Sequence, residues 1–212
     1  MNAHTEPFVL TGSAGTLECA LDAPDTTTFP TPRGVALIGH PHPLYGGTMD
    51  NKVVHTLARA FVSIGYVAAR MNFRGVGASA GVHDEGRGET DDMALLHDYL
   101  VQRYPGLPVA LAGFSFGTFV VAQLQVRLQA AGVPAERLVL VGTAAGKWDM
   151  PPVPANTILI HGEVDDTITL AAVLDWARPQ DLPVIVIPGA DHFFHRKLQP
   201  IKTLLVEMWR HG

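Results

Sequence analysis

The sequence lacks the features that mark several large classes of protein. Its 212 residues include one cysteine, Cys19, so no internal disulfide can form and a disulfide-stapled secreted fold is not indicated. There is no excess of basic residues: 15 Lys and Arg stand against 20 Asp and Glu, a formal charge of −5, which disfavours a nucleic-acid partner. No apolar run is long enough to span a membrane, and the first ten residues lack the basic and apolar segments of a signal peptide. We therefore expect a cytoplasmic protein without a nucleic-acid or membrane partner, and we predict no oligomeric state.

The overall composition is that of a folded globular protein. Hydrophobic residues make up 47% of the chain and charged residues 17%, which excludes a disordered chain. The length fits one domain with a substantial core. With no internal repeat, no low-complexity tract and no linker between halves, we expect residues 1–212 to form a single domain.

Short apolar runs alternate with amphipathic segments over most of the chain. The runs are β-branched, continuous and bounded by Gly or Pro, as is typical of strands covered on both faces. They lie at 35–38, 66–69, 109–112, 138–141, 157–160 and 184–187, and helix patterns lie at 53–64, 89–104, 115–131, 170–177 and 196–210. This alternation predicts an α/β fold with a mostly parallel central sheet and helices on both faces. An antiparallel hairpin, 8–10 with 17–21, is expected before it.

The stretch Gly-Phe-Ser-Phe-Gly at 113–117 follows a predicted strand and opens a predicted helix. In this setting a G-x-S-x-G pattern is typical of a nucleophile held on a sharp, strained turn. Gly113 and Gly117 are expected there because a Cβ would collide with the neighbouring strand and helix. Phe116 is expected to offer its backbone N–H to a developing oxyanion, and Phe114 to pack beside or below Ser115. The plainer alternative is a serine that only caps a helix.

A serine nucleophile requires a base, and the base requires an orienting acid. His192 follows the predicted strand 184–187, and three acidic residues, Glu163, Asp165 and Asp166, follow the strand 157–160. The carboxyl ends of parallel strands share one sheet edge, so these loops are expected to meet near Ser115. Any of the three carboxylates could be the acid on this reasoning.

Several motifs together resemble the α/β-hydrolase superfamily. They are HPHPLYGGTMDNKVV at 40–54, NFRGVGAS at 72–79, GFSFG, HGEVDD at 161–166 and DHFFHRK at 191–197. The chain is similar to the small bacterial branch that includes dienelactone hydrolases and minimal carboxylesterases. The resemblance implies that Ser115 is the nucleophile, Asp165 the acid and His192 the base, with no cofactor. Dienelactone hydrolases use a cysteine where this chain has Ser115, which favours ordinary ester chemistry.

The cluster His40-Pro41-His42-Pro43 follows the predicted strand 35–38, where this fold places its second oxyanion donor. Proline has no N–H, so the donor is expected to be the backbone of His42 or of Leu44, with His42 preferred. An H-x-H pair can also bind zinc, but no third ligand accompanies it in a clear pattern, and we expect no metal site.

We expect a serine carboxylesterase that acts on a small-molecule ester. The alternatives are a thioesterase, an aminopeptidase-like hydrolase with the same triad, and a non-catalytic ligand-binding homologue, which should lack a triad member. Residues 143–156 contain Pro151, Pro152 and Pro154 and are too short and too broken for a cap domain. The site is therefore expected to be open, with Tyr45, Phe114 and Trp148 as apolar walls and a preference for short acyl groups.

Overall fold

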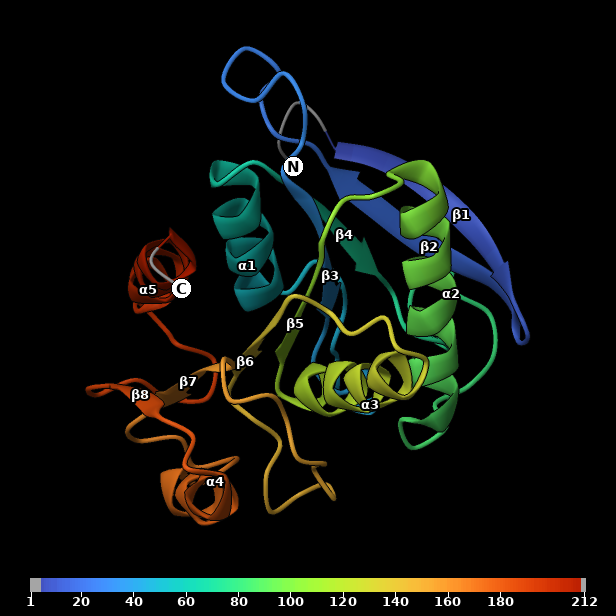
Figure 1. Cartoon of the computed structure of the whole chain (residues 1–212). Coiled ribbons are helices and arrows are strands. Elements are labelled where there is room, and N and C mark those ends of the chain that lie inside the picture. The colour runs from blue at the N-terminus through green and yellow to red at the C-terminus, as the bar shows by residue number, and fades with distance from the viewer. Residues whose placement is uncertain (1–4, 211–212) are drawn as a thin grey trace.

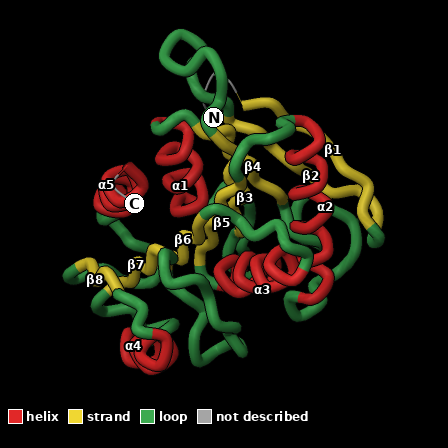
Figure 2. The backbone as a smooth tube through the Cα atoms, in the orientation of Figure 1, coloured by secondary structure: helices red, strands yellow, loops and turns green. Residues whose placement is uncertain are grey.

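The apolar runs form one eight-stranded sheet. The computed structural model describes residues 5–210, so the expectation for the first ten residues falls partly outside it. The strands are β1 Thr5–Gly12, β2 Gly15–Asp22, β3 Gly34–Gly39, β4 Tyr66–Met71, β5 Val109–Phe114, β6 Arg137–Val141, β7 Ile158–Gly162 and β8 Val184–Ile187. They lie in the order β1-β2-β4-β3-β5-β6-β7-β8, and Figure 2 shows them running side by side through the middle of the molecule.

The sheet is mostly parallel, with one antiparallel end. β1 and β2 form a hairpin in which Gly12 faces Gly15, and β2 pairs antiparallel with β4 so that Leu21 faces Ala69. Every pairing from β4 to β8 is parallel. The predicted fold class is thereby confirmed, including the N-terminal antiparallel hairpin.

The helices follow the predicted amphipathic segments closely. They are α1 Lys52–Ser63, α2 Arg87–Arg103, α3 Phe116–Ala130, α4 Leu170–Ala177 and α5 Leu198–Arg210, with short 3₁₀ turns η1 Pro43–Tyr45 and η2 Arg178–Gln180. Helix α5 begins two residues later than predicted. Arg196 has a φ of 60°, in the left-handed region that an α-helix cannot include.

Helices cover both faces of the sheet, as Figure 1 shows: α1 and α5 lie on one side, and α2, α3 and α4 on the other. Neighbouring residues of one strand therefore enter different cores. In β3, Leu37 packs in the cluster on the α2 and α3 side, whereas Ile38 packs in the cluster with α1 and α5. Both side chains are completely buried, which explains why the strands read as continuous apolar runs.

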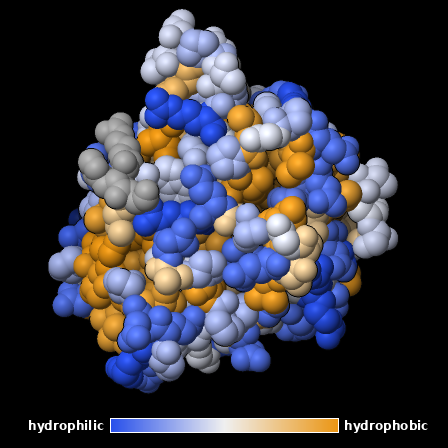
Figure 3. Space-filling model, viewed as in Figure 1, coloured by the Kyte–Doolittle hydropathy of each residue, from blue (hydrophilic) through white to orange (hydrophobic). Residues whose placement is uncertain are grey.

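Among the described residues, no cap domain covers the carboxyl-terminal edge of the sheet. Residues 143–156, all of them described, connect β6 to β7 without a helix. None of the described helices combines the length and apolarity needed to cross a membrane. On the face drawn in Figure 3, hydrophobic side chains lie in patches separated by hydrophilic ones.

Candidate active site

Ser115 lies on a sharp turn between β5 and α3. Its φ of 54° and ψ of −123° belong to a region that residues other than glycine rarely adopt. The Ser115 N–H donates to the carbonyl of Val141 at 3.0 Å, and the Thr118 hydroxyl donates to the Ser115 carbonyl at 2.6 Å. These bonds hold the turn from β6 and from α3, so its strain is supported on both sides.

The two glycines of the turn allow close backbone contact. A Cβ on Gly113 would lie 2.5 Å from the Gly117 carbonyl carbon, and a Cβ on Gly117 would lie 2.3 Å from the carbonyl oxygen of Gly39. Real Cβ atoms do not approach backbone so closely. The predicted reason for these glycines, collision with the neighbouring helix and strand, is confirmed.

The loops after β7 and β8 bring an acid and a histidine to Ser115. His192 Nε2 lies 2.9 Å from Ser115 Oγ, and His192 Nδ1 lies 2.7 Å from Asp165 Oδ2. An ionised carboxylate accepts, so Nδ1–H donates to Asp165 and the Nε2 lone pair faces the serine hydroxyl. All three residues are at least nine-tenths buried, and this arrangement can remove the hydroxyl proton as the oxygen attacks.

Asp165 is held by its own loop. Its Oδ1 accepts the N–H groups of Thr167 at 2.9 Å and Ile168 at 2.8 Å. Burial raises the pKa of Asp165, but the hydrogen bonds from His192 and Ile168 outweigh it, so the pKa lies below its ordinary value. The carboxylate therefore stays charged beside the histidine.

The other two acidic residues make no hydrogen bond to His192 among residues 5–210. Glu163 accepts the Gly189 N–H at 2.8 Å, and the exposed Asp166 accepts, among residues 5–210, a single 3.4 Å hydrogen bond from the Thr167 hydroxyl. Of the three acidic residues that the sequence offered, the structure brings only Asp165 to the ring.

Two backbone N–H groups are free near the serine. Phe116 is the first residue of α3, and neither its N–H nor that of His42 has a hydrogen-bond acceptor among residues 5–210. The alternative donor, the Leu44 N–H, donates to His42 Nδ1 at 3.2 Å. Phe116 and His42 both line the same cleft as Ser115. The geometry therefore favours His42 over Leu44 as the second oxyanion donor.

The H-x-H pair does not form a metal cluster. His40 is completely buried; its Nδ1–H donates to the Pro41 carbonyl at 2.6 Å, and its Nε2 accepts the Phe73 N–H at 2.9 Å. Burial lowers the pKa of His40 to about 4, which agrees with a neutral ring that ties two loops together. Among residues 5–210, no three His, Cys, Asp or Glu side chains gather as metal ligands would.

A cleft of about 530 Å³ opens beside Ser115 and His192. Tyr45 and Trp148 line it, as does Phe193, which is half exposed. The expectation for Phe114 as a wall is wrong. Its side chain is completely buried beneath the site, with its ring 5.1 Å from the His192 ring, so it supports the histidine and cannot touch a substrate.

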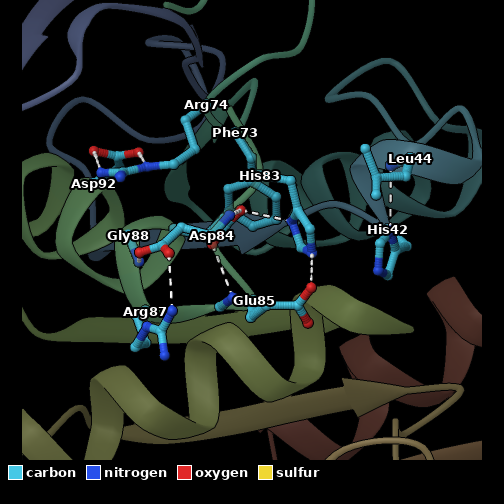
Figure 4. Close-up of polar contacts among 12 residues, drawn as sticks. His42, Leu44, Phe73, Arg74, His83, Asp84, Glu85, Arg87, Gly88 and Asp92 are labelled. Atoms are coloured by element: carbon cyan, nitrogen blue, oxygen red, sulfur yellow. Dashed lines mark hydrogen bonds and ion pairs between the residues drawn. The ribbon is translucent and has the colours of Figure 1, made fainter. Parts of the chain in front are cut away.

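The sequence does not indicate two further residues that lie next to the site. Lys147 lines the cleft from the loop after β6. His83, from the loop before α2, has a side chain only 6% exposed and donates through Nδ1 to the buried carboxylate of Glu89 at 2.7 Å. In Figure 4 its other nitrogen points toward Glu85, and nearby the guanidinium of Arg74 meets Asp92. Lys147 and His83 belong to no sequence motif, so only the fold of their loops shows that they lie beside the site.

Comparisons with known proteins agree with this geometry. The family model described as serine aminopeptidase, S33, matches residues 43–193. An uncharacterized protein of Rickettsia prowazekii is 35% identical over 182 residues, which cover 78% of this chain and 74% of that protein. A Xanthomonas campestris α/β serine hydrolase without a lid is 33% identical with a TM-score of 0.91, covering 100% of this chain and 96% of the other. An α/β serine hydrolase homologue from Coxiella burnetii is 31% identical with a TM-score of 0.83, covering 98% of each chain.

Proposed function

From the premise that this chain belongs to the α/β-hydrolase superfamily, in the family described as serine aminopeptidase S33, we propose that it hydrolyses carboxylic esters with short acyl groups. One observation carries the proposal: the hydrogen-bonded series Asp165–His192–Ser115 reaches an open cleft. An enzyme of this superfamily that cleaves an acyl bond needs that series and no cofactor.

The proposed reaction has two halves. Ser115 Oγ attacks the ester carbonyl while His192 Nε2 takes the hydroxyl proton, and Asp165 stabilises the resulting imidazolium. The carbonyl oxygen becomes an oxyanion bound by the N–H groups of Phe116 and His42. The tetrahedral intermediate then expels the alcohol, which receives the proton from His192. Water, activated by the same histidine, releases the acid and restores Ser115.

The preference for short acyl groups follows from the missing cap. Each buried methylene contributes about 0.8 kcal/mol, but only where protein covers it, and an uncapped cleft covers few. A panel of p-nitrophenyl esters of increasing acyl length, with Ser115→Ala as the blank, tests this. We expect kcat/KM to peak among the short esters. A steady rise through long-chain esters would mean that a loop closes over the cleft.

The description of the matching family makes an aminopeptidase the second candidate. Such an enzyme must bind the free ammonium group of its substrate, for which a carboxylate is the natural partner. No aspartate or glutamate of the described residues lines the cleft, whereas Lys147 does. We therefore favour an ester over an aminoacyl amide. Faster turnover of aminoacyl p-nitroanilides than of matched esters would reverse this choice.

A thioester is the third candidate substrate. The same triad would cleave an acyl-CoA, so acyl-CoA thioesters belong in the panel. Faster turnover of these thioesters than of matched oxygen esters would favour a thioesterase. We also propose a cytoplasmic location, which the single cysteine supports, and a small-molecule substrate, which agrees with the size of the cleft. Cell fractionation with an antibody tests the location.

A further inference from the structure

The residues that line the cleft differ in charge from the chain as a whole. The chain has a formal charge of −5, yet Lys147 is the lysine that lines the cleft and no described acidic residue lines it. Lys147 is exposed and makes no ion pair or hydrogen bond through its side chain in the part of the chain that the structure describes. An ammonium group at a cleft with no partner of its own is free to bind an anion.

The backbone that carries Lys147 is fixed to the nucleophile turn. The Lys147 N–H donates to the Ala144 carbonyl at 3.2 Å, and the Ala144 N–H donates to the Thr118 hydroxyl at 2.9 Å. That hydroxyl donates to the Ser115 carbonyl at 2.6 Å. Three hydrogen bonds thus connect Lys147 to Ser115, so the lysine stem starts from a fixed position beside the reacting group.

The neighbouring residue shows which side of the site this loop covers. The Trp148 ring lies 4.8 Å from the Phe116 ring and 5.7 Å from the His42 ring. The backbone N–H groups of Phe116 and His42 are the proposed oxyanion donors. Lys147 therefore extends from a loop packed against the oxyanion side of the cleft.

We propose, on the basis of the proposed esterase function, that Lys147 makes the enzyme selective for esters that carry an anionic group, such as a carboxylate, on the acyl or the alcohol part. The aromatic surfaces of Tyr45, Trp148 and Phe193 would hold the apolar part of the substrate while the ammonium group binds the anion.

Two matched ester pairs test this selectivity. The acyl pair is p-nitrophenyl hydrogen succinate against its neutral isostere p-nitrophenyl 4-oxopentanoate. The alcohol pair is 4-acetoxybenzoate against methyl 4-acetoxybenzoate. The readout is the anionic-to-neutral ratio of kcat/KM, compared between wild type and Lys147→Gln so that intrinsic reactivity cancels. Lys202→Gln is the matched control, because Lys202 on α5 does not line the cleft.

In at least one pair we expect Lys147→Gln to lower the ratio about fivefold, as for a partly solvated ion pair of about 1 kcal/mol. Lys147→Arg should retain most of the ratio, and added salt should reduce it in wild type. A ratio unchanged by Lys147→Gln in both pairs overturns this inference and leaves the esterase proposal standing. No hydrolysis of any of the four esters by wild type would instead overturn the esterase proposal.

A separate observation concerns His83. Its ring lies 4.6 Å from the His42 ring and 5.3 Å from the Phe116 ring. One side chain therefore contacts both residues that carry the proposed oxyanion donors. The hydrogen bond to Glu89 fixes the ring, and the Glu89 carboxylate also accepts the N–H groups of Asp84 and Gly86 at 2.9 Å each. Figure 4 shows His83 beside His42, held on a loop from a different part of the chain.

We infer that His83 is a positioning residue that keeps the His42 and Phe116 N–H groups aimed at one point. The oxyanion exists only in the transition state, so loosening its donors should lower kcat and leave KM nearly unchanged. If His83 served stability alone, replacing it would lower the melting temperature without lowering kcat relative to KM.

The test compares His83→Ala with His83→Phe, which keeps the ring but loses the Glu89 bond. We expect kcat for a short p-nitrophenyl ester to fall about tenfold in His83→Ala, less than the loss from deleting a donor outright, with KM within twofold. His83→Phe should recover part of that loss. A boronic acid inhibitor places an anionic oxygen where the oxyanion of the transition state forms. Its affinity for His83→Ala should fall by about the same factor as kcat. His97→Ala on α2 is the control.

Unchanged kcat in His83→Ala overturns the inference. So does a lower kcat with unchanged boronic acid affinity. If His83→Ala does not fold, His83→Phe carries the test, and wild-type kcat together with wild-type boronic acid affinity in that variant also overturns the inference.

Discussion

Replacing Asp165 with asparagine should remove most of the activity and spare the fold. Asp165 Oδ1 accepts the N–H groups of Thr167 and Ile168, while Oδ2 accepts Nδ1–H of His192. An asparagine keeps one acceptor, and the two backbone donors will hold it, so its amide NH₂ turns toward His192. Nδ1 must then accept, which moves the ring proton to Nε2. The ring can no longer take the proton of Ser115.

The magnitude follows from this loss of the base. The equivalent change in a serine protease triad lowers kcat by about 10⁴, and we expect a loss of about 10³- to 10⁴-fold here, or about 4 to 5.5 kcal/mol of transition-state stabilisation. The matched variant is Asp166→Asn, because the exposed Asp166 side chain accepts just one hydrogen bond from the described residues, from the Thr167 hydroxyl at 3.4 Å. Its kcat should stay within about twofold of wild type.

The assay is steady-state hydrolysis of a short p-nitrophenyl ester by both variants, each checked by circular dichroism and thermal unfolding. Equal losses in the two variants would refute the reasoning, because the structure gives the two carboxylates different roles. A small loss in Asp165→Asn alone would refute the assignment of the base.

Three further predictions test the buried groups. Phe114→Ala should lower the free energy of unfolding by about 3–5 kcal/mol in urea titrations, because the ring is completely buried; a cost below about 1 kcal/mol would contradict this packing role. The pKa of Asp165 lies below its ordinary 3.8 in the folded protein, so its charge stabilises the fold above that pH and the contribution is lost as the pH falls through the folded value. The stability difference between wild type and Asp165→Asn should therefore shrink under acid, and a constant difference would argue against it. Cys19 is 1% exposed and burial raises its pKa to about 12, so a thiol reagent at pH 8 should modify it only after denaturation; rapid modification of the native protein would show that β2 opens.

The sheet and the serine turn could be predicted because their signals are local. A strand covered on both faces must be apolar throughout, and β3 is buried from Gly34 to Gly39. The glycines of the turn are required by backbone contacts within a few ångströms, such as Gly117 against Gly39. Such constraints leave a pattern in the sequence whatever the distant loops do.

The orientation of Phe114 and the second layer of the site could not be predicted in the same way. Phe114 and Phe116 flank the serine symmetrically in the sequence, but the turn sends Phe114 into the core beside α1 and α5 and Phe116 into the core beside α2 and α3. Only the turn geometry decides which one faces the cleft. His83 reaches His42 because the loop before α2 folds back across the site, and no periodicity encodes that long-range contact.

The proposed role of Ser115 as the nucleophile is tested most directly by covalent labelling. Wild-type protein and Ser115→Ala are treated with a fluorophosphonate and digested, and the site of modification is found by mass spectrometry. We expect one adduct, on the peptide that contains Ser115, absent from Ser115→Ala along with ester hydrolysis. Labelling of a different residue, or activity of Ser115→Ala close to that of wild type, would contradict the account.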